Sequence, residues 1–311
     1  MLRKHYWLVA VIGLVLLLFL INNSLRLFAL HPFTYTADGD IKVMCMNIHS
    51  VGENFNTRSK GIYELVNKES PDFVYLTEYH DTCNAWLDST LCKKYTYNAR
   101  GIKYDYRTEC LYSKWEINEV RPIKIDPEDG KVSEYIKQSV FVKEHYSHPS
   151  ILRVELTHST HNVIIYVCHL ESNNYLNEVN DSLLHGNNTL QIIERRLKAY
   201  QSGAMLRELE VDAIVQNMEQ EKYPVIVMGD FNDIYPSYTL KHLQNKTIGL
   251  RDAWWDGGFG LGNTFGGVFW GLRIDHILYS SGLELADVKH GHTGLSDHRA
   301  LISSFIITNN H

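Results

Sequence analysis

Apolar residues form one long run near the N-terminus of the chain and then recur in short runs. The long run, residues 7–21 (WLVAVIGLVLLLFLI), follows the basic residues Arg3, Lys4 and His5. A helix rises about 1.5 Å per residue, so this run with its flanks could nearly cross a hydrocarbon core. It lacks the polar face of a helix that packs on a soluble domain. The pattern therefore indicates either a signal anchor or a cleaved signal peptide.

We favour an N-terminal transmembrane anchor over residues 1–34, because the segment after the run (NNSLRLFALHPF) has no clear small-x-small cleavage site. Basic residues before the run predict a cytoplasmic N-terminus, by the positive-inside rule. The chain is thus expected to be a single-pass membrane protein whose remaining residues lie outside the cytoplasm. Cleavage of the segment would instead make the protein secreted.

Beyond the anchor, short β-rich runs alternate with helical stretches, and no internal repeat is present. Turn residues bound most of the predicted strands, which are residues 41–48, 72–78, 109–114, 151–157, 163–170, 225–230, 273–280 and 300–307. Helices are predicted over 58–68 and 190–220, each ending shortly before a proline. This alternation predicts layers of sheet that are covered by helices.

Composition narrows the class of protein further. With 44% hydrophobic and 21% charged residues among 311, the chain can bury a core, which excludes a disordered protein. The length suits one large domain or two small ones. A net charge of −6 argues against tight binding to long polyanions, although enzymes that only cut polyanions can be acidic.

Five cysteines are too few, and odd in number, for a disulfide scaffold. Cys45 and Cys168 lie in apolar runs and are expected to be buried free thiols. Cys83 and Cys92 flank a short polar segment, and a disulfide between them is a hypothesis. A zinc site is disfavoured because no CxxC or HxxxH spacing is present.

Several predicted strands end in a polar residue that could bind a metal or a phosphate, namely Asn47, Glu78, His169 and Asp230. A single case would indicate only a strand that enters a solvated loop. Their recurrence indicates a site built on the rim of a rigid sheet.

Two short motifs are the most informative. In PVIVMGDFNDIYP, Asp230 and Asn232 are two residues apart and project to the same side of an extended chain. The carboxylate could bind a cation while the amide donates to a phosphate. In Ser296-Asp297-His298, the histidine could accept a proton from water if a carboxylate, for which we nominate Asp275, fixed its tautomer.

Taken in order, these residues resemble the endonuclease/exonuclease/phosphatase superfamily of metal-dependent phosphoesterases. The resemblance extends over nearly all of the chain after residue 40 and rests on Asn47, Glu78, His169, Asp230, Asn232, Asp275, Asp297 and His298. It implies a four-layer αββα sandwich, with two packed sheets flanked by helices. Asn47 and His298 must then share one site, so residues 35–311 are expected to form a single catalytic domain.

The resemblance also implies a role for each of these side chains. Glu78 would bind the metal, with Asn47 and Asp297 close to it, and Asp230 and Asn232 would position the attacking water and the scissile phosphate. His298, oriented by Asp275, would act as general base or stabilise charge in the transition state. His169 would contact the phosphate or assist the leaving group, and Thr264 could donate to the phosphate.

Physical chemistry favours a cation in such a site independently of the resemblance. Several carboxylates converging in one pocket repel each other, and some would protonate unless a cation neutralised them. Oxygen-rich ligation indicates Mg²⁺ or Mn²⁺, with Ca²⁺ as an alternative, and argues against zinc.

The substrate is left open between nucleic acid, a phospholipid and a small phosphorylated molecule. His80 stands where deoxyribonuclease-like members carry an arginine, which weakens a nuclease assignment. No basic run indicates duplex binding, and no Lys/Arg cluster indicates a polyphosphorylated ring. The glycine- and aromatic-rich segment 254–271 could present rings to a base or a lipid, but packing under the sheet edge is favoured.

Two other functions compete with hydrolysis. One is a catalytically inactive relative that acts as a membrane-anchored binding module, and the other is a structural membrane module. Every expected catalytic position is filled, which disfavours the first, and a structural module would leave the carboxylates unexplained. No obligate protein partner is inferred.

Overall fold

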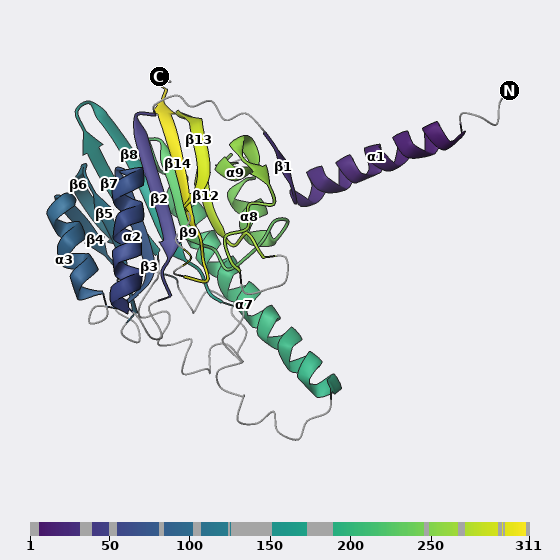
Figure 1. Ribbon diagram of the computed structural model, residues 1–311, viewed down its shortest axis with the longest axis horizontal. Coiled ribbons are helices and arrows are strands. Elements are labelled where there is room, and N and C mark those ends of the chain that lie inside the picture. The colour runs from purple at the N-terminus through teal and green to yellow at the C-terminus, as the bar shows by residue number, and fades with distance from the viewer. Residues whose placement is uncertain are drawn as a thin grey trace.

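Two six-stranded sheets form the centre of the protein in the computed structural model (Figure 1). The structure describes residues 6–31, 39–49, 55–80, 84–101, 107–123, 125, 151–172, 189–245, 249–266, 271–291, 294 and 296–308. In order across the first sheet lie β10 (Arg251–Asp252), β12 (Asp275–Tyr279), β9 (Val225–Asp230), β8 (His161–His169), β7 (Ile151–His158) and β6 (Glu116–Pro122). In order across the second lie β13 (Leu283–Gly291), β14 (Ala300–Ile307), β2 (Ile41–Asn47), β3 (Phe73–His80), β5 (Arg107–Ser113) and β4 (Tyr97–Arg100).

The sheets pack face to face because their strands carry apolar side chains on both faces. In β2, Val43 and Cys45 point into the core between the sheets, where they join Ile226 and Met228 of β9. The intervening residues Met44 and Met46 point to the opposite face, as the two-residue period of a strand requires. Such continuous apolar runs are what strands buried on both faces need.

Helices cover both outer faces of this pair of sheets. The helices α2 (Phe55–Glu69) and α3 (Ala85–Lys94) pack on the second sheet. On the first sheet lie α7 (Thr189–Met218) and α8 (Tyr238–Leu243), and the short α9 (Ala253–Gly257) packs beside β13. The layers are thus helix, sheet, sheet, helix, which confirms the predicted α/β sandwich.

The strands missed by the sequence prediction lie mainly at sheet edges. β4, β6 and β13 are edge strands, and most β6 side chains are exposed. An edge strand needs no continuous apolar run, so its sequence (EINEVRP in β6) carries little signal. The eight predicted strands are all present, with ends that differ by at most two residues from those predicted.

Before the sandwich, the helix α1 (Tyr6–Leu25) projects away from the rest of the protein (Figure 1). Its apolar side chains between Val11 and Ile21 are 41–61% exposed. Among the described residues, no helix meets the length and hydropathy expected of a membrane span. The transmembrane part of the fold prediction is therefore not confirmed, and its boundary at residue 34 lies outside the described residues.

The segment after α1 docks on the sandwich. Arg26 donates to Gln244 Oε1 at 2.6 Å, and its guanidinium lies 4.6 Å from the centre of the Tyr235 ring. β1 (Ala29–Leu30) then pairs with β11 (Phe259–Gly260) in a separate two-stranded ribbon. The end of α1 is thereby held against the first sheet's side of the domain.

Other expectations have mixed outcomes. Cys45 and Cys168 are buried free thiols, as predicted, and so is Cys110. Cys92 is an exposed free thiol, while Cys83, its partner in the hypothesised disulfide, lies outside the described residues. In the aromatic segment, Trp254 belongs to the core between the sheets, whereas Phe259 is 59% exposed.

Gly229 gives a test of how closely the sheet is packed beside the site. Its φ is +143°, and a Cβ there would lie 1.9 Å from the Cys168 carbonyl oxygen. We expect Gly229→Ala to lower the free energy of unfolding by roughly 3 kcal/mol or more in urea denaturation. Gly249→Ala is the control, because its φ is +68° but no atom lies within 4 Å of the added carbon. Gly249→Ala should lower the free energy of unfolding by only about 1 kcal/mol. Equal losses of stability in the two variants would show that the structure relieves the clash between the added Cβ at position 229 and the Cys168 carbonyl.

Candidate active site

The candidate site lies where strands of both sheets reach the same edge of the sandwich. In the first sheet, Asp230 ends β9, pairs in register with His169 at the end of the parallel strand β8, and faces Asp275 at the start of the antiparallel strand β12. In the second sheet, Asn47 ends β2 beside the parallel strand β3. Strand direction therefore delivers these four side chains to one place.

Asn47 joins the two sheets at this edge. Its side-chain amide donates to Glu78 Oε1 at 3.1 Å and to Asp230 Oδ2 at 3.0 Å. The side chain is almost fully buried, with 2% of Asn47 exposed. An amide in this position holds two carboxylates together without adding charge.

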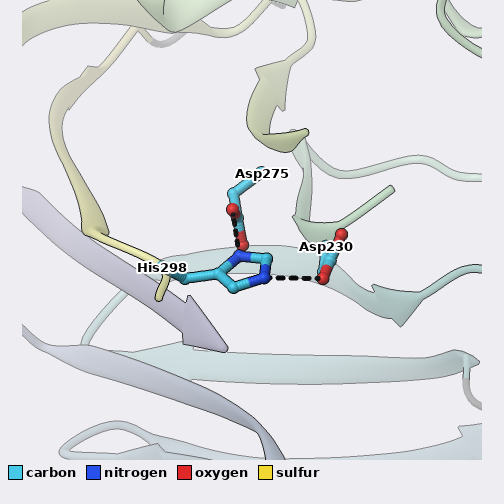
Figure 2. A group of neighbouring side chains, drawn as sticks. All are labelled: Asp230, Asp275 and His298. Atoms are coloured by element: carbon cyan, nitrogen blue, oxygen red, sulfur yellow. Dashed lines mark hydrogen bonds and ion pairs between the residues drawn. The ribbon is translucent and has the colours of Figure 1, made fainter. Parts of the chain in front are cut away.

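His298 lies between two buried carboxylates (Figure 2). Its Nδ1 is 2.8 Å from Asp275 Oδ2, and its Nε2 is 3.8 Å from Asp230 Oδ2. Burial alone would lower the pKa of His298, but the charge and hydrogen bond of Asp275 outweigh it and raise the pKa to about 9. Burial raises the pKa of Asp230, and the nearby charge of Asp275 raises it further.

His169 forms a second charged pair on the other side of Asp230. Its Nδ1 lies 3.5 Å from Glu109 Oε1, and its Nε2 lies 3.9 Å from both Glu78 Oε1 and Asp230 Oδ2. The other oxygen of Glu109 accepts a short hydrogen bond from the Tyr75 hydroxyl. Burial opposes the charged form of His169, yet Glu109 and Asp230 raise its pKa to about 10.

Glu78 sits at a break in its strand. The β3–β5 register shifts between Leu76 and Tyr79, and Glu78 has φ +52°. His49, two residues after Asn47, places Nδ1 3.3 Å from Glu78 Oε2. The hydrogen bond with Glu78 raises the pKa of His49 against the effect of burial, and the charge of Asp297 adds to the rise.

Three other predicted residues occupy supporting positions. Asn232 donates from its side chain to the Leu170 carbonyl at 2.8 Å, and its backbone N–H donates to Asp230 Oδ1 at 2.9 Å. Thr264 is fully buried, and its hydroxyl accepts from the backbone N–H groups of Ile274 and Asp275. Thr264 therefore fixes the start of β12 from behind Asp275.

Asp297 is exposed and lies on the loop before β14. The neighbouring Ser296 hydroxyl bonds to the Asn47 carbonyl at 2.8 Å, which ties this loop to the end of β2. The structure thus gathers Asn47, Glu78, His169, Asp230, Asp275 and His298 directly, with Asn232, Thr264 and Asp297 around them. The side chain of His80 lies outside the described residues.

Four residues at the site escaped the sequence prediction: Glu109, Tyr75, His49 and Ser296. Glu109 opens the run ECLYSK, so a charged residue at the head of an otherwise apolar strand was a usable signal. Ser296 was named only as part of the motif Ser296-Asp297-His298, without a role of its own. Tyr75 lies inside the buried strand β3 and His49 in the loop after β2, and no local pattern distinguishes these two.

Several features fit a bound cation. Asp230, Asp275 and His298 offer ligand atoms that lie within 4.8 Å of one another. Asp275 Oδ1 is buried without a hydrogen-bond partner among the described residues. In this trio, His298 Nδ1 and Asp275 Oδ2 are already engaged in a hydrogen bond with each other. The partly exposed Glu78 is therefore a more accessible metal ligand than these three residues. A buried surplus of carboxylates of this kind fits a divalent ion with oxygen ligands.

Comparison with protein families gives a match over most of the chain. The sequence model of the Endonuclease/Exonuclease/phosphatase family matches residues 46–298. These bounds run from the residue before Asn47 to His298 and so include every predicted site residue. No curated protein sequence matches the chain.

Solved structures share the fold at low sequence identity. Humanized D. rerio TDP2 has a TM-score of 0.60 and 16% identity, covering 85% of this chain and 98% of that one. The human Nocturnin catalytic domain with bound sulfate has a TM-score of 0.60 and 18% identity, covering 86% and 94%. A Bacteroides vulgatus endonuclease/exonuclease/phosphatase has a TM-score of 0.59 and 12% identity, covering 86% and 99%.

The pairing of Asp275 with His298 predicts how the site titrates. In metal-free protein, Asp275→Asn should lower the pKa of His298 from about 9 by roughly 1–3 units, measured by histidine NMR. A raised pKa stabilises the fold fully below about pH 6.5, and this contribution is lost as the pH rises through about 9. The stability difference between wild type and variant should therefore shrink between pH 7 and 10.

The matched control is Asp212→Asn, which alters an Asp–His pair formed with His242 at 3.1 Å on α7 and α8. It should leave the pKa of His298 unchanged. If the pKa of His298 is the same in Asp275→Asn as in the wild type, burial and the charge of Asp230, and not Asp275, set that pKa.

Proposed function

This chain belongs to the Endonuclease/Exonuclease/phosphatase family of hydrolases, and we propose that it hydrolyses a phosphoester by metal-assisted attack of water on phosphorus. The observation that carries the proposal is the His298 ring between two buried carboxylates, one of which has an oxygen without a hydrogen-bond partner in the described part of the chain. Such a group can hold and move a proton beside a bound phosphate.

Each side chain has a role that follows from its contacts. Glu78, supported by Asn47 and with Asp297 near it, would hold the metal. Asp230 would orient the water, since its Oδ1 is engaged by the Asn232 backbone while Oδ2 faces both histidines. Asn232 would reach the phosphate after releasing the Leu170 carbonyl.

The two histidines divide the proton transfers. His169, whose pKa is raised to about 10, is protonated near neutral pH and suits donation to the leaving oxygen. Glu109 fixes the orientation of this ring through Nδ1. His298, oriented by Asp275, would accept a proton from water or stabilise charge at the phosphorus.

A divalent cation, for which we propose Mg²⁺ with Mn²⁺ or Ca²⁺ as alternatives, would polarise a phosphoryl oxygen and neutralise the carboxylates. A general base must be unprotonated to act, and the pKa of His298 is about 9 in the metal-free site. His298 can therefore accept a proton at neutral pH only after the negative charge around its ring has been reduced, which a bound cation would do.

The first substrate class to examine is nucleic acid. D. rerio TDP2, which shares the fold at a TM-score of 0.60 and 15% identity, was solved with a single strand DNA product. A phospholipid or a small phosphorylated molecule is the alternative. A panel of single-stranded DNA, duplex DNA, RNA, sphingomyelin, phosphoinositides and sugar phosphates at one metal concentration separates these classes.

Activity on a generic diester tests the reaction class. The full chain should hydrolyse bis(p-nitrophenyl) phosphate with Mg²⁺ or Mn²⁺ and stop when EDTA is added. Asp230→Asn should lower kcat/KM by about 100-fold or more, because the water loses its carboxylate acceptor. Asp287→Asn, on the edge strand β13, should leave the rate unchanged. Full activity in Asp230→Asn would defeat the proposal.

We also propose that α1 holds the enzyme at a lipid bilayer, with the catalytic domain on the extracytoplasmic side. Support comes from the exposed apolar side chains of α1 and from the docking of the following segment on the sandwich. A helix that is apolar on all sides is unfavourable in water, because its apolar surface remains exposed to solvent.

Vesicle flotation tests this second proposal. The full chain should float with phosphatidylcholine liposomes, whereas the double substitution Leu14→Lys and Leu18→Lys should release it. Each lysine would cost about 2.5–3.5 kcal/mol at the centre of the apolar stretch. Leu197→Lys on α7 is the matched control, because its exposure of 59% is close to the 55% and 56% of the other two. A chain that stays with the soluble fraction overturns the attachment and leaves the hydrolase proposal intact.

A further inference from the structure

His49 shares an unusual backbone conformation with two of the site residues. Non-glycine residues with φ in the left-handed region, within the described part of the chain, are Arg26, His49, Ser70, Glu78, Ser159 and Asn232. Three of these six, His49, Glu78 and Asn232, lie at the site, and the sequence pattern assigned His49 no role there. A left-handed backbone costs free energy in any residue with a Cβ, so it persists only where the surroundings impose it.

Two hydrogen bonds impose the conformation of His49. Its backbone N–H donates to Asn47 Oδ1 at 3.0 Å, and its carbonyl accepts from Arg58 at 3.0 Å. The φ of His49 is +39° as a result. Asn47 therefore uses its amide nitrogen on Glu78 and Asp230 and its oxygen on His49, so one side chain fixes all three.

The result is a ring placed beside the second carboxylate oxygen of Glu78. Glu78 Oε1 accepts from Asn47, whereas Oε2 faces His49 Nδ1 at 3.3 Å. The His49 side chain is 42% exposed and that of Glu78 is 14% exposed, so solvent reaches both side chains. A hydrogen bond between two partly exposed groups contributes little stability, which makes it a weak reason to maintain the strained backbone.

We propose that His49 Nδ1 and Glu78 Oε2 jointly ligate the catalytic divalent cation, which gives the site one nitrogen ligand. The inference rests on the proposed metal-dependent function and deepens it by choosing, among the three ions named there, Mn²⁺ over Mg²⁺. Mg²⁺ strongly prefers oxygen ligands, whereas imidazole nitrogen suits transition metals. The site should therefore bind Mn²⁺ in preference to Mg²⁺.

Pulsed EPR on the Mn²⁺-loaded full chain tests the ligand directly. Wild type should show modulation from a directly bound ¹⁴N, and His49→Asn should abolish it. Asparagine is the variant of choice because it tolerates the left-handed backbone and replaces the nitrogen ligand with an amide oxygen. Titration should show Mn²⁺ affinity reduced by about tenfold or more, with Mg²⁺ affinity changed by less than about threefold.

Two control variants separate this ligand from other histidines. His169→Gln removes the other imidazole close to Glu78 and should keep the ¹⁴N signal. His161→Asn, at the opposite end of β8, should change neither signal nor affinity. Retention of the signal in His49→Asn, or its loss in His169→Gln, would overturn the proposal.

The failure of this inference is distinguishable from failure of the proposed function. Mn²⁺ that binds and supports hydrolysis without any ¹⁴N modulation refutes nitrogen ligation by His49 and leaves the hydrolase proposal standing. No binding of Mn²⁺ or Mg²⁺ to the wild-type chain refutes both.

Discussion

Repulsion between buried carboxylates is the constraint on which the rest of the site depends. Asp230 and Asp275 face each other across neighbouring strands, and both are at most 1% exposed. Two negative charges in such a position destabilise each other strongly where water is excluded. The sandwich offsets this with the His298 ring between them and with His169 on the other side of Asp230. The raised pKa values of both histidines are the direct consequence of that surplus of negative charge.

A rigid frame is needed to keep these groups together. Asp230 ends β9 and Asp275 begins β12, and these two strands pair with each other in register inside the first sheet, which restrains both carboxylates. Asn47 links the two sheets at this edge through its hydrogen bonds to Glu78 and Asp230. The strained backbones of Glu78, Asn232 and His49 are consistent with such a frame, since packed surroundings can hold conformations that an isolated chain would avoid.

The same physics explains which parts of the fold were readable from the sequence. Central strands such as β2 and β9 are buried on both faces, so their residues form continuous apolar runs with sharp ends. The edge strands β4, β6 and β13 bury one side at most, and their mixed sequences resemble loops. α3 was also missed, since only Leu87 and Leu91 of its ten residues are buried side chains that would mark a periodic face.

By itself the sequence predicted layers of sheet covered by helices and polar residues at the ends of strands, because both follow from local patterns along the chain. The four-layer αββα order was implied by the family resemblance, and Asp275 was nominated as the partner of His298. Only the tertiary structure decided which side chains pair with the strand-end polar residues from distant strands. Glu109 becomes the partner of His169, and His49 turns its ring toward Glu78, through contacts between different elements. Burial and hydrogen-bond competition set these pairings, and both depend on how the two sheets close on each other, which no local pattern records.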